Sequence, residues 1–76
     1  MNHREEIGKQ LEAIRKSKNL TQEGVSRLTG LNRANISKIE RGKYNVSIDI
    51  LSKITDALDS RIEIVKTNPI ITLTGY

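Results

Sequence analysis

The chain has 76 residues, 13 lysines and arginines against 9 aspartates and glutamates, a net charge of +4 and no cysteine. This length allows one small domain with a marginal core, and the composition excludes a disulfide framework and, with His3 as the single histidine, leads us to expect no metal and no cofactor. No stretch is long and apolar enough for a transmembrane helix, and the N-terminal MNHREE lacks an apolar signal region, so we expect a cytoplasmic protein with no membrane partner.

The positive charge is concentrated in the middle of the chain. Residues 1–30 carry six basic and four acidic groups (net +2), residues 31–46 carry a net charge of +3, and residues 47–76 carry −1. A dense positive region is the electrostatic footprint of a nucleic-acid-binding face, although a merely solvated basic surface has the same sign. Nucleic acid is therefore a candidate partner that charge alone does not establish.

The first predicted element is an amphipathic helix over residues 4–18. Ile7, Leu11 and Ile14 recur at helical spacing and form one apolar stripe. Glutamates in the first turn and basic residues in the last turn match the helix dipole. Asn19 can end the helix in the left-handed conformation.

Three further helices, predicted over residues 22–29, 33–41 and 48–58, share one start signal. Each follows an N-cap residue, and apolar residues on either side of the cap form a hydrophobic staple. The N-caps are Thr21, Asn32 and Ser47, and the staples join Leu20 to Val25, Leu31 to Ile36 and Val46 to Leu51. Gly30 and Gly42 lie where a glycine closes the second and third helices.

This phasing also predicts the core, which is expected to contain Ile7, Leu11, Ile14, Val25, Leu28, Leu31, Ile36, Ile39, Ile50, Leu51, Ile54 and Leu58. Ser26 is small enough for a close helix crossing. Gly24 costs about 1 kcal/mol relative to alanine inside a helix, and we interpret it as a tolerated weakness rather than as a close approach of another backbone. We expect Glu40 to pair with a basic residue such as Arg15, as a surface pair worth about 0–1 kcal/mol.

After the fourth helix the hydrophobic period changes to alternation. Residues 61–66 predict a β-strand, and residues 70–74 a second strand after a turn. Because an isolated hairpin is marginal in water, we expect residues 61–66 to pair with the same segment of a second copy across a two-fold axis. The residues assigned to this dimerisation are Ile62, Ile64 and Val65. The alternative is that the segment packs on its own domain and that the tail is disordered.

Residues 11–58 resemble the Xre-type helix-turn-helix family, which includes phage Cro and the lambda-like repressors. The resemblance rests on LTQ at the start of the second helix, Gly30 in the turn, ISKIERGK at the end of the third helix, and the apolar fourth helix. It implies a mainly α fold, a lambda-repressor-like helical bundle over residues 1–60, followed by the strand and tail of residues 61–76.

The predicted strand after the fourth helix is similar in architecture to HipB-type antitoxins. This second resemblance implies a transcriptional repressor, in the bacterial cytoplasm and on the nucleoid when bound, that autoregulates a toxin-antitoxin operon and binds a HipA-like kinase toxin. A phage-type Cro-like repressor and a protein-interaction module without DNA binding are the alternatives. We expect no enzyme, because no pairing of acidic, basic and nucleophilic groups supports catalysis.

The family's binding mode implies that the third helix enters the major groove with its N-terminal half toward the base edges. Arg33 is the best candidate for bidentate contact with guanine O6 and N7, and Lys38 can reach another guanine acceptor. Asn35 or Asn32 can bridge adenine N6 and N7, and Ala34 can touch a thymine methyl group. Asn32 has a competing role, because an N-cap side chain bonds its own backbone.

Gln22 opens the second helix, whose N-terminal N–H groups can face a phosphate. The resemblance implies that this glutamine clamps the phosphate and braces the reading helix. The other residues expected on the DNA backbone are Ser37, Arg41, Lys43, Tyr44 and Asn45. Because one such domain buries too little surface for tight specific binding, we expect a homodimer on an inverted-repeat operator of double-stranded DNA, with half-sites about 34 Å apart.

Overall fold

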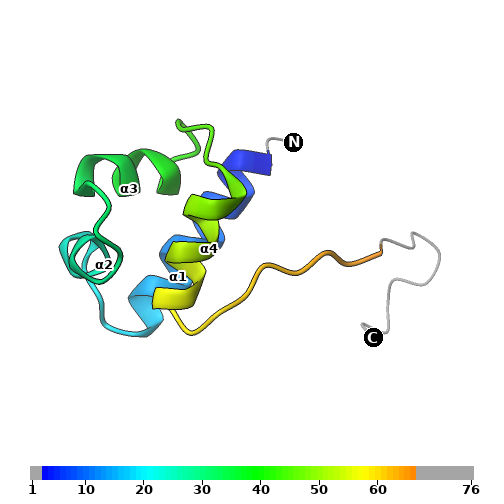
Figure 1. Cartoon of the computed structure of the whole chain (residues 1–76). Helices are drawn as coiled ribbons and strands as arrows, with labels where there is room; N and C mark the ends of the chain where they lie inside the picture. The colour runs from blue at the N-terminus through cyan, green and yellow to red at the C-terminus, as the bar shows by residue number, and fades with distance from the viewer. Residues whose placement is uncertain (1–2, 67–76) are drawn as a thin grey trace.

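The computed structural model describes residues 3–66, which form a bundle of four helices (Figure 1). These are α1 (His3–Ser17), α2 (Gln22–Thr29), α3 (Arg33–Glu40) and α4 (Ile48–Ala57). Each predicted helix is confirmed, with its ends within one residue of the predicted range. Helix α3 packs against α1 and α2, and α2 also packs against α4.

The predicted N-caps are confirmed at the starts of α2, α3 and α4. Thr21 and Ser47 each accept a hydrogen bond from the backbone N–H three residues further along the chain, at 3.0 and 3.1 Å. Asn32 accepts one from the backbone N–H two residues along, at 2.7 Å. These bonds satisfy N–H groups that the first turn of a helix leaves without a partner.

The helix ends are also as predicted. Asn19, Gly30 and Gly42 follow α1, α2 and α3 with φ angles of 57°, 76° and 72°. The left-handed region is costly for most side chains but open to glycine and tolerated by asparagine. These three residues therefore turn the chain sharply between consecutive helices.

Apolar side chains from all four helices and from the end of α4 form the core. Within the described part of the chain, its buried members are Leu11, Val25, Ile36, Ile39, Leu51, Ile54 and Leu58, surrounded by partly buried apolar residues that include the staple residues Leu20, Leu31 and Val46. The prediction is wrong for Leu28, which is 61% exposed. The buried face of α2 runs through Gln22, Val25, Ser26 and Thr29, and Leu28 lies about 100° of helical rotation from its centre.

Gly8, which the sequence analysis did not single out, brings α1 against α3. It is buried, and a Cβ atom built on it would lie less than 3.0 Å from the backbone carbonyl groups of Ile39 and Glu40. Gly24 has no such constraint, since a Cβ atom there would meet Leu20 and Thr21 only at 3.5 Å, an ordinary contact. Within the described chain no other backbone approaches Gly24 closely, which argues against the close-approach alternative, and the interpretation of Gly24 as a tolerated weakness stays a prediction.

The predicted strand over residues 61–66 is not present. These residues have no regular secondary structure and all are exposed, and the segment that they form extends beyond the four helices after α4 (Figure 1). A β-strand requires a neighbouring strand to accept and donate its backbone hydrogen bonds, and the described part of the chain offers none. The second predicted strand, residues 70–74, lies outside the described residues. Within residues 3–66, no helix is both long and apolar enough to cross a bilayer.

Candidate nucleic-acid interface

Helix α3 has one face in the core and one face in solvent. Ile36, Ile39 and Glu40 are buried. The opposite face carries the residues predicted to contact DNA, of which Arg33, Ala34 and Lys38 are exposed and Asn35 and Ser37 are half-buried. The helix therefore presents a polar, basic surface while its other side is anchored to the domain.

The turn between α2 and α3 is held by side-chain hydrogen bonds. The hydroxyl of Ser26 donates to the carbonyl oxygen of Leu31 at 2.6 Å, and the N–H of Leu31 donates to the hydroxyl of Thr29 at 3.2 Å. Ser26 is thus more than a small side chain at a helix crossing. These bonds constrain the orientation of α3 relative to α2, which a helix that reads base edges requires.

A buried ion pair joins α1 to the end of α3. The guanidinium of Arg15 donates from Nε to Glu40 Oε2 at 2.7 Å, from Nη2 to Glu40 Oε1 at 3.0 Å, and from Nη1 to the carbonyl oxygen of Leu20 at 2.8 Å. The predicted pairing is confirmed, but its description as a surface pair is wrong, because both residues are buried. The hydrogen bond with Glu40 raises the pKa of Arg15, although burial acts in the opposite direction.

Gln22 extends this ion pair into α2. Its side chain is half-buried, and Nε2 donates to Glu40 Oε1 at 3.0 Å. The bond ties the first turn of α2 to the last turn of α3. Because an amide nitrogen carries two hydrogens, this arrangement leaves the second hydrogen of Gln22 for another acceptor.

Asn32 is exposed, but its side-chain oxygen already accepts the N–H of Ala34. A bidentate contact with adenine needs both the oxygen and the nitrogen of the amide. Asn32 would therefore have to leave the cap in order to read a base. Asn35 has no such capping role in α3, whose N-cap is Asn32.

The segment after α3 adds basic groups beside the exposed face. Arg41, Lys43 and Asn45 are exposed, whereas Tyr44 packs its ring against the core. Arg41 and Lys43 line a concave surface together with Lys9 of α1 and the carboxylates of Glu5, Glu12 and Glu40. The sequence analysis assigned no role to Lys9, which follows Gly8 and reaches this position because α1 approaches α3 so closely there.

Arg33 forms an ion pair that sequence reasoning also missed. Its Nε lies 3.7 Å from Oε1 of Glu23, and both side chains are more than half exposed. Glu23 belongs to the first turn of α2, where an acidic residue also matches the helix dipole. No local sequence pattern distinguishes this carboxylate from an ordinary solvated one, because its partner lies on the next helix.

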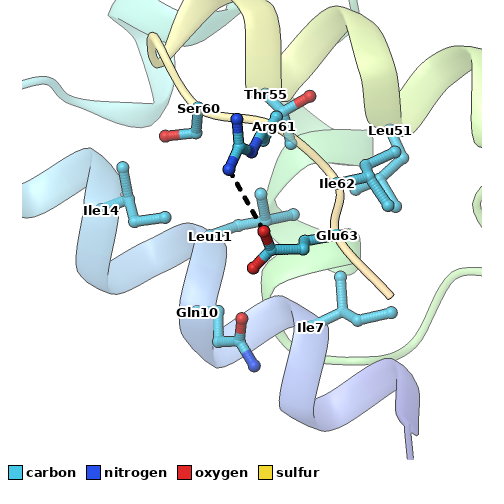
Figure 2. Close-up of a pocket in the computed structure, with 10 residues that line it drawn as sticks. All are labelled: Ile7, Gln10, Leu11, Ile14, Leu51, Thr55, Ser60, Arg61, Ile62 and Glu63. Atoms are coloured by element: carbon cyan, nitrogen blue, oxygen red, sulfur yellow. Dashed lines mark hydrogen bonds and ion pairs between the residues drawn. The ribbon is translucent and has the colours of Figure 1, made fainter. Parts of the chain in front are cut away.

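The residues assigned to dimerisation are all exposed, and Ile64 is 95% exposed. Ile62 contributes to an apolar groove between α1 and α4 that also contains Ile7, Leu11 and Leu51 (Figure 2). At its rim, Arg61 Nη2 donates to Glu63 Oε2 at 3.2 Å. The isolated chain therefore exposes an apolar surface on and beside the segment that was predicted to pair.

Comparison with known proteins supports the reading of the fold. Residues 11–65 match the helix-turn-helix family. An immunity repressor protein of Bacillus phage phi105 is 34% identical over 56 residues, which cover 74% of this chain and 39% of the repressor. The chain thus spans about two fifths of the length of that relative.

A solved structure is consistent with this match to the helix-turn-helix family. The crystal structure of the restriction-modification controller protein C.AhdI from Aeromonas hydrophila is similar with a TM-score of 0.77 and 34% identity, over 80% of this chain and 92% of that chain. The order of the helices, the polar outer face of α3 and the sequence match all point to the same family. The chain belongs to the helix-turn-helix family of DNA-binding regulators.

Proposed function

We propose that this protein is a transcriptional repressor that binds a specific inverted-repeat operator in double-stranded DNA as a homodimer. The observation that carries the proposal is the division of α3 into a buried face, which packs in the domain, and a solvent-facing side with exposed arginine, lysine and alanine and a half-buried asparagine. The names of the similar proteins, an immunity repressor and a controller protein, support a regulatory role.

In the proposed complex α3 lies in the major groove, with Arg33 on a guanine and Lys38 toward a second guanine acceptor. Asn35 faces an adenine, and Ala34 contacts a thymine methyl group. Asn32 remains the N-cap of α3, which its hydrogen bond supports.

The DNA backbone would be held by groups on both sides of α3. Gln22 uses its remaining amide hydrogen on a phosphate while it braces α3 through Glu40. Ser37, Arg41, Lys43, Tyr44 and Asn45 are the other proposed backbone contacts. Lys9 joins them, because it lines the same concave surface as Arg41 and Lys43.

We expect a dimer because a single DNA-binding domain buries only about 600–1,000 Å² on DNA, which is too little for tight specific binding. Ile62, Ile64 and Val65 are apolar and exposed, and a second copy would supply the strand partner that a single chain lacks. The HipA-like toxin is left out of the proposal, because the similar proteins are named as an immunity repressor and a controller protein.

The test begins with selection of DNA by the wild-type protein from a library of duplexes with a randomised centre, followed by titration of the enriched duplex and of a scrambled duplex of equal composition. Arg33→Ala is expected to cost about 1–3 kcal/mol on the enriched duplex and to relax the preference at one base pair per half-site. Fluorescence anisotropy at fixed salt measures both effects.

Arg27→Ala is the matched control, because Arg27 is an exposed arginine of α2 outside the proposed base-reading face. It should leave every base preference intact. Equal weakening on all sequences by Arg33→Ala would contradict the base-reading assignment. A wild-type protein that enriches no duplex would contradict the repressor and favour the protein-interaction module.

A further inference from the structure

Glu23 is an exposed carboxylate within the helix-turn-helix itself, whereas Glu5 and Glu12 belong to α1, beside Arg41 and Lys43. Between residues 21 and 45, all of which the structure describes, the acidic residues are Glu23 and Glu40. Glu40 is buried, and Arg15 neutralises it. Glu23 is therefore the acidic group of this region that would face a nucleic acid, where nearby phosphates would repel it.

Glu23 lies next to Arg33. Glu23 lies in the first turn of α2, Arg33 is the first residue of α3, and the pair joins the two helices across the motif at 3.7 Å. At this distance the contact is an ion pair rather than a hydrogen bond. The carboxylate lies on the Nε side of the guanidinium.

A guanidinium has five N–H donors in a planar fork. Bidentate recognition of guanine needs two of them, directed at O6 and N7. An acceptor on the Nε side leaves both terminal nitrogens of Arg33 for the base. Glu23 can therefore keep its contact while Arg33 reads a guanine.

The same carboxylate also affects binding to DNA sequences that lack this guanine. On DNA without a guanine in reach, the best acceptor for a flexible arginine is a phosphate oxygen, a contact that carries no sequence information. Glu23 competes with that phosphate for Arg33. It also adds repulsion toward the DNA backbone, and both effects weaken non-specific binding.

We propose that Glu23 is a positioning residue that sets the specificity of Arg33, by orienting its guanidinium for guanine and by disfavouring its contact with phosphate. The inference rests on the proposed function, because it assumes that Arg33 reads a base. On this proposal, a residue of α2 contributes to the base selectivity of the exposed face of α3.

The test uses Glu23→Gln, which removes the charge and keeps the size of the side chain. The probes are the duplex enriched by the wild-type protein, its three substitutions at the base pair that Arg33→Ala relaxes, and the scrambled duplex. Affinity for the scrambled duplex should rise about two- to five-fold per half-site, the range of an exposed ion pair. Discrimination at the Arg33 base pair should fall by a similar factor, and Glu23→Asp should restore part of it.

Asp56→Asn is the charge-matched control, since Asp56 is an exposed carboxylate of α4, away from the α2–α3 pair. It should leave discrimination unchanged. Glu23→Gln in the Arg33→Ala background should also leave discrimination unchanged, because a residue that acts through Arg33 has no effect without it. Thermal unfolding of each variant separates these effects from the contribution of Glu23 to the dipole of α2.

Two results would overturn the inference while the repressor proposal stands. One is equal discrimination by the wild type and Glu23→Gln, and the other is the same loss of discrimination with and without Arg33. In both cases Glu23 would act on helix stability or on overall charge only. If the wild-type protein enriches no duplex, the proposed function fails first and the inference fails with it.

Discussion

At the scale of single residues, the Arg15–Glu40 pair has the largest expected effect on stability. Two ionised groups are removed from water, and only good geometry offsets the cost of their desolvation. Arg15 uses three nitrogens, two on Glu40 and one on the carbonyl of Leu20. Gln22 donates to the same carboxylate, so one buried anion connects α1, α2 and α3 behind the face that is proposed to bind DNA.

Replacement of one partner should therefore be severe. Arg15→Met keeps an unbranched apolar side chain but leaves the Glu40 carboxylate buried without a cation, and we expect a loss of about 3–5 kcal/mol in the free energy of unfolding. Urea denaturation followed by circular dichroism measures it. A loss below about 1 kcal/mol would mean that the pair behaves as an exposed one.

The double variant Arg15→Met/Glu40→Leu is the control for this loss. An apolar pair of similar volume often restores the stability of a buried ion pair, so the double variant should be clearly more stable than Arg15→Met alone. Gln22 would then lack its acceptor. DNA binding should stay weaker than in the wild type even where the fold is restored, which separates the two roles of Glu40.

At the scale of elements, the contact between α1 and α3 depends on the absence of a side chain at one position. Gly8 lets the backbone of α1 lie directly on the last carbonyl groups of α3. This contact fixes the C-terminal end of α3, while the α2–α3 turn fixes its start. It also brings Lys9, with Glu5 and Glu12, to the concave surface that Arg41 and Lys43 line, so the packing of two helices decides which charges gather there.

The two glycines inside helices should respond in opposite ways to alanine. Gly8→Ala would drive a methyl group into the backbone of α3 and should cost about 1–3 kcal/mol or more. Gly24→Ala meets only ordinary contacts and should stabilise the protein by up to about 1 kcal/mol through helix propensity. Thermal unfolding of the two variants in one buffer makes the comparison. A Gly8→Ala variant as stable as the wild type would contradict the close approach at Gly8, and a destabilised Gly24→Ala variant would contradict the prediction for Gly24.

At the scale of the whole molecule, the isolated chain leaves part of its apolar surface uncovered. The groove between α1 and α4 is open (Figure 2), and residues 61–66 expose isoleucine and valine side chains. Exposed apolar surface near an unpaired extended segment favours association with another chain. A two-fold dimer would cover this surface and place two copies of α3 on one face of the DNA.

Truncation after Ser60 should weaken the dimer without unfolding the bundle, because the removed residues contribute nothing to the buried core. Sedimentation equilibrium measures the dimer dissociation constant. Ile64→Ser is the point variant for the same interface, since Ile64 is almost fully exposed in the single chain. A dimer that is equally tight after both changes would place the interface elsewhere.

The salt dependence of operator binding reports the number of phosphates that are neutralised. If each subunit contacts about four phosphates, the slope of log K against log salt should be near −7 for the dimer, at about −0.9 per phosphate. Titrations between 50 and 200 mM salt, roughly the range over which this effect is large, give the slope. A truncated protein that binds as a monomer should give about half this value, and an unchanged slope would contradict binding as a dimer.

The sequence predicts the helices well because their signals are local. Thr21, Asn32 and Ser47 act on backbone groups two or three residues away, and Gly30 and Gly42 act through their own φ angles. The periodicity predicts most of the core. It fails at Leu28, because the short α2 offers too few positions to show which way its apolar stripe faces.

The expected strand over residues 61–66 shows a different limit of prediction from the sequence. Alternation in residues 61–66 describes a segment suited to a sheet, but a sheet also requires a neighbouring strand. The described chain has none, and its sequence does not say what a second copy would provide.

By itself, the sequence determined four helices, their ends and the polar outer face of α3, because each depends on residues within about one or two helical turns. It also determined the family, because several such local features follow one another in the family's order over residues 11–58. Only the tertiary structure decided that Arg15 and Glu40 are buried together, that Gly8 is a point of backbone contact and that Glu23 lies against Arg33. These depend on the distances and angles at which helices cross, which many distant contacts set together. The exposed face of α3 is thus a local feature, but its bracing and the ion pair beside Arg33 belong to the folded molecule.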